Sequence, residues 1–330
     1  MKRIVSLFFF IALTTVVCSQ VVFKFEDGIY DKMLNVKVEF VERNVSNLLS
    51  AINNAQQRND TVLNLRNVTI ENFARQGLCN LWKTLPFHCV SKTNVQSCLK
   101  DATEFEIRQI PVRVIPKDNS YKGLLQKELT ISFNKNGVIT GVRMSLDNNS
   151  YQSLLLGDSK RVNDIEERRT ILKFVEDFRS FYVEKNLDAI YNIFDENALI
   201  VTGRVITPNN MNSAEISDQR KRVIYTKQNR DQYKKNLRRV FQSNKYIHVD
   251  FSNIELMRHG SREGFYGVRL RQKWDSQKYN GDNYNDDGYL FLLWDFRNKE
   301  QPRIHVRSWS PALNIKSEDD LLSPEDFGLN

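Results

Sequence analysis

The sequence is poor in the residues and motifs on which common catalytic sites depend. Its 330 residues include four histidines and four cysteines. It contains no His-Glu-x-x-His pair, no glycine-rich phosphate loop and no Gly-x-Ser-x-Gly turn. These absences argue against zinc proteases, P-loop nucleotide-binding enzymes and serine hydrolases, so the sequence carries no signature of a reaction.

The sequence also lacks an apolar stretch long enough to cross a membrane, since a spanning helix needs about 20 apolar residues. Its longest apolar stretch runs from Ile4 to Val17 behind a basic start and is followed by the small residue Ser19. This pattern is typical of a secretory signal peptide. We expect residues 1–19 to be removed and the protein to be exported, to the periplasm or outside the cell. Lipid anchoring through Cys18 is not expected, because Val17 departs from the small residue of lipoprotein signals.

Three cysteines remain after the signal peptide, namely Cys79, Cys89 and Cys98. An odd number in an exported protein indicates one disulfide with a free thiol, or no disulfide. Cys89 and Cys98 enclose a short polar loop and are the first candidate pair, with Cys79–Cys89 as the alternative. A zinc site that adds His88 is not expected, because the cysteines lack the short spacing of zinc ligands. We expect no metal and no cofactor.

The charge balance is mildly basic. The formal net charge is +8 at pH 7, from 48 lysines and arginines against 40 aspartates and glutamates. A basic balance can indicate a nucleic-acid partner. Here the acidic residues are scattered among the basic ones, and an exported protein meets few nucleic acids. We therefore expect no nucleic-acid partner.

The stretch over residues 162–206 is the most regular part of the sequence. Apolar residues recur at helical spacing from Ile165 to Tyr182, and charged residues, among them Glu176 and Arg179, fill the opposite side. This pattern predicts an amphipathic helix whose apolar stripe is buried and whose charged side stays in water.

A short helix over residues 187–194 and a strand over residues 198–201 are predicted to follow. This order resembles the nuclear transport factor 2-like superfamily, including its SnoaL-like branch. The residues that carry the resemblance are Phe178, Tyr182, Asn186, Leu187, Asp188, Ile190, Phe194, Asp195, Asn197, Ala198 and Gly203. It covers residues 162–311 and implies a cone, in which helices pack inside a strongly curved antiparallel sheet. The chain as a whole is also similar to exported proteins of Bacteroidetes bacteria.

The rest of the chain fits two such domains in tandem. Downstream, a third helix is predicted over residues 229–243, then four strands at 246–256, 264–274, 288–296 and 302–309, with a loop over residues 275–287. Upstream, helices over residues 31–57 and 69–85 precede strands, two of which meet in a hairpin at Asn136-Gly137. The alternative is an unrelated α+β domain upstream.

The expected fold class is therefore α+β. The expected segments are a signal peptide (1–19), an N-terminal α+β domain (20–150), a linker (151–163), a cone domain (164–311) and an acidic tail (312–330).

Candidate site residues follow from the resemblance. Enzymes of the superfamily hold an Asp or His inside the cone, where it moves a proton beside a carbonyl. The first candidates of this kind are His305 and Asp295, and the second are His248 and Asp250. His248 can also be interpreted as an incidental surface residue. Strand alternation places His305, Arg307 and Trp309 on one face. The ligand-pocket candidates are Tyr182, Trp274, Trp294, Arg307 and Trp309.

Three functions remain open. The first is an exported, non-enzymatic protein that binds a small apolar ligand or an envelope protein. The second is an isomerase- or cyclase-like enzyme, and the third is a scaffold that forms a homodimer through the sheet. A roomy apolar cavity favours binding, a buried polarised Asp or His favours chemistry, and a cone filled by its own aromatic side chains favours a scaffold.

Overall fold

The computed structural model describes residues 20–26, 34–96, 98–100, 104–117, 121–156, 162, 164–206 and 222–328. The predicted signal peptide lies outside these residues. Within them, no helix is both long and apolar enough to cross a membrane.

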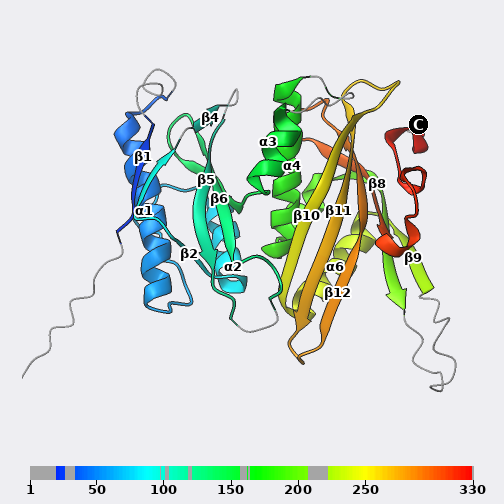
Figure 1. Ribbon diagram of the computed structural model, residues 1–330, viewed down its shortest axis with the longest axis horizontal. Coiled ribbons are helices and arrows are strands. Elements are labelled where there is room, and N and C mark those ends of the chain that lie inside the picture. The colour runs from blue at the N-terminus through cyan, green and yellow to red at the C-terminus, as the bar shows by residue number, and fades with distance from the viewer. Residues whose placement is uncertain are drawn as a thin grey trace, which may run out of the picture.

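The N-terminal half places a helix on each side of an antiparallel sheet (Figure 1). The sheet contains β2 (Phe87–Cys89), β5 (Glu104–Val114), β6 (Gln126–Asn134) and β7 (Ile139–Met144), in this order, with β4 (Cys98–Lys100) paired to β5. Beside it, β1 (Val22–Phe25) and β3 (Thr93–Gln96) pair in parallel. The helices are α1 (Val38–Gln57) and α2 (Asn72–Thr84), close to the predicted pair. Gly137 has a φ of +73° and makes the predicted hairpin.

The C-terminal half is a cone, which confirms the α+β fold class. Its helices are α3 (Asn148–Leu156), α4 (Ile165–Val183), α5 (Leu187–Ile193) and α6 (Arg230–Ser243). The sheet, in spatial order, contains β10 (Asn244–Arg258), β11 (Phe265–Lys278), β12 (Asn283–Asp295), β13 (Arg303–Pro311), β8 (Phe194–Ile206) and β9 (Arg222–Gln228). Every pairing is antiparallel except β13 with β8, which is parallel. The expectation of a purely antiparallel sheet is wrong at that one position.

Local sequence explains where the cone helices begin. Asp164 accepts a hydrogen bond from the backbone N–H of Glu166 at the start of α4, and Asn186 does the same for Ala189 in α5. Asn229 and Gln232 form a reciprocal capping box at the start of α6. Such caps satisfy backbone donors that have no partner within the helix.

Helix α4 belongs to both halves of the molecule. Its apolar side packs inside the curved C-terminal sheet, and its charged side faces the N-terminal sheet (Figure 1). The prediction that this charged side stays in water is wrong: Glu176 is fully buried and Arg179 nearly so. A single hydrophobic cluster extends through both halves. The expected linker also differs, because α3 occupies its first part and buries Tyr151 and Leu155 against α4 and β10.

An ion cluster joins the two halves at this contact, which we call the seam. It consists of Glu106 and Arg108 on β5, Arg143 on β7, and Glu176 with Asp177 on α4. Glu176 accepts hydrogen bonds from Arg108 at 2.7 and 2.9 Å, from Arg143 at 3.1 Å and from the backbone N–H of Leu146 at 2.7 Å. Arg108 and Arg143 are thus paired with Glu176 across the seam, whereas Glu106 is paired with the same two arginines within the N-terminal sheet.

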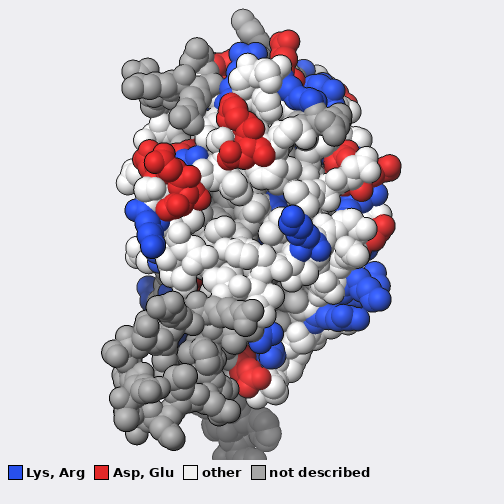
Figure 2. All heavy atoms as spheres, turned by 90° about the vertical axis from the view of Figure 1, so that its right-hand side faces the viewer, with Lys and Arg blue, Asp and Glu red and all other residues white. Residues whose placement is uncertain are grey.

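The predicted acidic tail folds back over the outer face of the sheet. Leu322 and Phe327 pack on an apolar patch of Met257, Phe265, Phe291, Leu293 and Val306. Arg269 donates to the carbonyls of Leu321 and Leu322 at 3.5 and 3.0 Å. The side of the molecule that carries this segment shows acidic and basic side chains interspersed (Figure 2). A homodimer through the sheet stays a prediction, and this part of the outer face is already covered.

Phe327→Ala should test how firmly the tail is docked. The Phe327 ring stacks on Phe291 with centroids 5.3 Å apart. Because Phe327 is half-buried, we expect the free energy of unfolding to fall by about 1–2 kcal/mol. Denaturant titration followed by circular dichroism measures it. Leu313→Ala, at an exposed site, is the control; equal stabilities of the two variants would contradict the docked tail.

Candidate ligand-binding site

Three predicted pocket residues meet inside the cone, at the C-terminal end of α4. The hydroxyls of Tyr182 and Tyr233 lie 2.6 Å apart, and the Tyr182 ring meets Trp274 edge to face at 5.7 Å. The Arg307 guanidinium lies 5.6 Å from the centre of the Tyr233 ring and hydrogen bonds the Tyr182 hydroxyl. Trp309 is buried next to Arg307 on the same face of β13. The resemblance therefore identified residues that do converge.

Two members of this cluster were missed by sequence reasoning. Tyr233 lies in the helix predicted over residues 229–243 and Asp286 in the predicted loop 275–287, and neither is among the predicted pocket residues. That loop is largely strand, because β11 runs to Lys278 and β12 starts at Asn283. Alternation along β12 is the signal that could have placed Asp286 on the inner face.

Asp286 is the unusual carboxyl of the cone. Burial raises its pKa to about 6, although the Tyr284 hydroxyl, 3.0 Å away, and the charge of Arg307 act against this rise. Its Oδ1, the Nε of Arg307 and the Nε1 of Trp309 are buried without hydrogen-bond partners. A protonated Asp286 and the two phenols could donate hydrogen bonds to an oxygen atom of a ligand.

The space around this cluster is nevertheless filled by aromatic side chains. Phe178 contacts Tyr182, Phe194, Phe251 and Trp294, with ring centroids 5.0 to 6.5 Å apart. Trp294 is fully buried and also packs on Phe174 and Phe296, so its surroundings are those of a core residue. This end of the cone is a packed polar core.

His305 and Asp295 lie on the outer face of the sheet, away from the cone interior. Leu293 of β12 pairs with Val306 of β13, and the next residue, Trp294, pairs with Ile304. A β-bulge at this point therefore leaves His305 without a cross-strand partner. Ile304 and Arg307 consequently both point inward, and the prediction that His305 shares a face with Arg307 is wrong. His305 Nε2 lies 3.5 Å from an Asp295 carboxylate oxygen.

The surroundings of Asp295 do not suit a general base, which needs a raised pKa. Partial burial would raise its pKa, but hydrogen bonds and charge from Arg297 hold the pKa below its usual value. The geometry therefore gives neither candidate a place beside a substrate inside the cone.

A cavity of about 420 Å³ lies at the opposite, N-terminal end of α4. Ile171, Phe296 and Tyr266 form its apolar wall, and Glu167 hydrogen bonds the Tyr266 hydroxyl. Burial and this bond raise the pKa of Tyr266, so the phenol keeps its proton. Charged side chains at the rim are Arg258, Glu263, Arg297 and Lys299.

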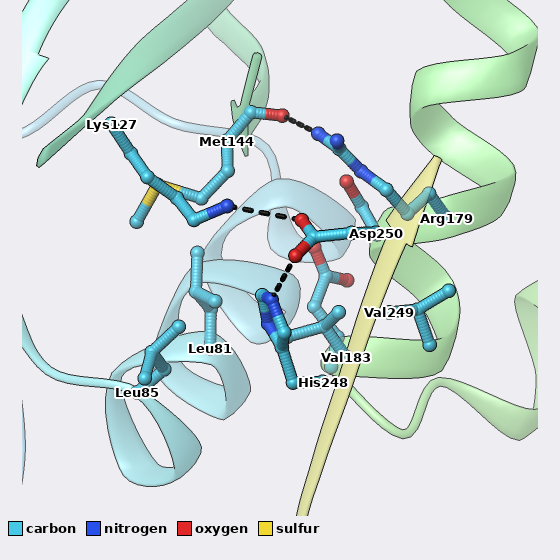
Figure 3. Close-up of a pocket in the computed structure, with 11 residues that line it drawn as sticks. Leu81, Leu85, Lys127, Met144, Arg179, Val183, His248, Val249 and Asp250 are labelled. Atoms are coloured by element: carbon cyan, nitrogen blue, oxygen red, sulfur yellow. Dashed lines mark hydrogen bonds and ion pairs between the residues drawn. The ribbon is translucent and has the colours of Figure 1, made fainter. Parts of the chain in front are cut away.

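A second polar site lies at the seam (Figure 3). His248 Nε2 lies 2.6 Å from Asp250 Oδ2, and Lys127 Nζ lies 3.1 Å from Asp250 Oδ1. His248 is only 3% exposed, so its interpretation as an incidental surface residue is wrong. Burial acts to raise the pKa of Asp250, but His248, Lys127 and Arg179 hold it far below the usual value.

The enclosed space beside Asp250 has a volume of about 20 Å³, with Leu81 and Leu85 in its wall. That is room for about one water molecule. Arg179 points away from Asp250 and donates to the carbonyl of Met144 (Figure 3). The Lys127–Asp250 ion pair is thus a polar contact between β6 of the N-terminal sheet and β10, and His248 supports Asp250 from the same strand.

The cysteines give no support to a metal site. Cys79 and Cys89 are free thiols, and the side chain of Cys98 lies outside the described residues. Because Cys89 is a free thiol, neither the Cys89–Cys98 pairing nor the alternative Cys79–Cys89 is formed in this structure. Among the described residues, no group of three or more His, Cys, Asp or Glu could hold a metal ion.

Comparisons with known proteins show structural likeness only. No family model matches the sequence, and no curated protein matches it. Three of the similar solved structures are a candidate aromatic ring hydroxylase and a candidate scytalone dehydratase from Novosphingobium aromaticivorans, and the beta subunit of benzoate 1,2-dioxygenase from Burkholderia mallei. Their identities to this chain are 14%, 16% and 14%, with TM-scores of 0.35, 0.34 and 0.31. The matches cover 46%, 44% and 46% of this chain and 92%, 84% and 95% of those chains. Likenesses of this size say nothing about the activity of this protein.

Proposed function

We propose that this protein binds a small molecule with an apolar body and an anionic group, and that the ligand occupies the cavity at the N-terminal end of α4. The observation that carries the proposal is the size of this cavity, about 420 Å³. Small-molecule sites typically enclose about 300–1,000 Å³ and combine apolar walls with a few polar groups.

The lining indicates the chemistry of the ligand. Phe296 and Ile171 offer apolar surface, and Tyr266 offers a protonated phenol. The rim has three cations, Arg258, Arg297 and Lys299, against the carboxylates Glu167 and Glu263. Glu167 keeps its charge while it accepts a hydrogen bond from the Tyr266 hydroxyl. Arg297 is paired with Asp295, so Arg258 and Lys299 are the cations of the rim that can meet an anionic group. Opposite charge attracts an anionic group, and salt weakens this attraction at an exposed rim.

Binding is favoured over catalysis by the same residues. Among the described residues that line this cavity there is no histidine and no cysteine. His305 and Asp295, the residues of the enzyme hypothesis, lie on the outer face of the sheet. We therefore propose a non-enzymatic role. The signal-peptide pattern of residues 1–19 supports a place outside the cytoplasm.

Filling the cavity should abolish binding. Thr170 lines it from α4, so Thr170→Phe would place a ring in the space that the ligand needs. We expect native mass spectrometry of protein from its own host to show a retained small molecule, and the variant to lose it. In titration calorimetry with 2-naphthoate as probe, Arg258→Gln should weaken binding about five- to tenfold through loss of one cation.

Arg262→Gln is the matched control, because Arg262 is an exposed arginine near the rim that does not line the cavity. It should bind 2-naphthoate like the unchanged protein. Equal retention of the ligand by Thr170→Phe, or equal affinity for 2-naphthoate and its neutral amide, would refute the proposal.

A further inference from the structure

A second cavity, of about 240 Å³, opens where the two halves meet below the His248–Asp250 pair. The N-terminal half contributes Lys83, Lys117 and Tyr121, and the C-terminal half contributes Lys245, Tyr246 and Tyr279. These residues come from α2, the loop after β5, the start of β10 and the turn between β11 and β12. The cavity is thus complete only when both halves are in place.

The charge of this cavity has one sign. Three lysines line it, and none of its described lining residues is acidic. Lys185 adds a fourth positive group close by, because its Nζ donates to the backbone carbonyls of Asn244 and Lys245. Lys117 likewise donates to the carbonyl of Lys83, which fixes two of the lysine-bearing segments against each other.

The nearest described carboxylates do not cancel this charge. Asp250 is paired with both Lys127 and His248 (Figure 3). Asp275 also acts electrostatically on Tyr121, but it is not among the residues that line the cavity. The positive field of the lysines therefore remains directed into the cavity.

Aromatic rings line the same space. Tyr121 and Tyr246 meet edge to face at 5.9 Å, and Tyr121 contacts the His248 ring at 4.9 Å behind them. Tyr279 is 70% exposed at the rim, where a free ring face can meet a ligand. Rings that flank cations suit ligands with both a ring and an anionic group.

We propose that this cavity binds a single-ring sugar bearing a phosphate or sulfate ester. Its volume lies below the usual range of about 300–1,000 Å³ for drug-sized ligands, which limits the ligand to one ring. The lysines would hold the ester oxygens, and Tyr279 would pack on the sugar. This site is independent of the cavity at the other end of the cone.

Titration calorimetry on the full chain tests the proposal with glucose 6-phosphate, glucose 6-sulfate, inorganic phosphate and glucose. Saturable binding of the esters below about 1 mM is expected, and none of glucose. Lys83→Gln and Lys245→Gln should each weaken ester binding about five- to tenfold, and raised salt should weaken it further. Tyr279→Ala should weaken the esters about threefold or more while leaving inorganic phosphate unchanged.

Lys235→Gln is the matched control, since it removes the same charge from the exposed side of α6. It should bind the esters like the unchanged protein, and all variants should keep its circular dichroism spectrum and melting temperature. Tighter binding of one ester identifies phosphate or sulfate as the recognised group. Absence of saturable binding, binding of glucose equal to its esters, or equal effects of Lys83→Gln and Lys235→Gln would overturn the proposal.

Discussion

Glu176→Gln is expected to lower the free energy of unfolding by about 3–5 kcal/mol, because it leaves buried arginines without their counter-charge. Glu176 is fully buried and accepts hydrogen bonds from Arg108, Arg143 and the backbone of Leu146. Glutamine keeps the volume of the side chain but removes its charge. Its amide NH₂ group would also face the N–H donors of Arg108, Arg143 and Leu146, to which it cannot hydrogen bond as an acceptor. Burial alone would raise the pKa of Glu176, yet the two arginines hold it below the usual value.

Denaturation by guanidinium, followed by circular dichroism and tryptophan fluorescence, measures this loss. Trp82 reports on the N-terminal half, and the other three tryptophans report on the cone. Since one hydrophobic cluster extends through both halves, we expect the circular dichroism and fluorescence signals to change at the same guanidinium concentration. Glu196→Gln is the control, with a side chain that is 84% exposed and 4.0 Å from Arg230. It should cost about 0–1 kcal/mol; a similar small cost for Glu176→Gln would contradict the role of the ion cluster.

Acid should weaken the same cluster. Burial opposes ionisation of Glu106, but Arg143 and Arg108 lower its pKa from 4.5 to about 2. A carboxyl with a depressed folded pKa stabilises the protein above its unfolded pKa, and this contribution is lost as pH falls through the folded value. The ion cluster should therefore lose stability between about pH 4.5 and 2.

Glu184→Gln is expected to have the opposite, alkaline signature. Burial raises the pKa of Glu184 from 4.5 to about 8; the charge of Asp177 adds to the rise and Arg143 opposes it. A group with a raised folded pKa contributes stability at low pH, and the contribution disappears as pH rises through the folded value. Glutamine mimics the protonated side chain at every pH. The variant should match the unchanged protein near pH 4 and exceed it by about 2–4 kcal/mol near pH 9.

The measurement is the difference in unfolding free energy between variant and unchanged protein at several pH values, which cancels the titration of all other groups. Glu300→Gln, at an exposed turn residue, should show a difference that does not change with pH. A constant difference for Glu184→Gln as well would mean that the buried carboxyl is ionised throughout.

The sequence predicted the helices and most strands because their signals are local. The stripe from Ile165 to Tyr182 and the turn at Gly137 each act within a few residues, and the structure confirms both. The burial of Glu176 was missed because its partners Arg108 and Arg143 lie 68 and 33 residues away. A charged helix side looks the same in sequence whether water or a complementary charged sheet covers it.

The site was predicted in part, for a related reason. Tyr182 lies on the apolar stripe of helix α4, and Trp274 and Arg307 follow strand alternation on β11 and β13, so the three converge. His305 fails because one bulge between β12 and β13 shifts the alternation, and nothing near His305 in the sequence marks a bulge. The lysines of the seam cavity come from segments as far apart as Lys83 and Lys245, so only the folded chain brings them together.

The sharing of α4 has a consequence for the order of events during translation. The inner face of the N-terminal sheet bears Arg108 and Arg143, whose partner Glu176 is made later. Ribosomes add about 5–20 residues per second, so these groups wait several seconds for their partner to emerge. A nascent chain stalled before α4 should expose this charged sheet to chaperones and proteases, whereas one extended beyond Val183 should protect it.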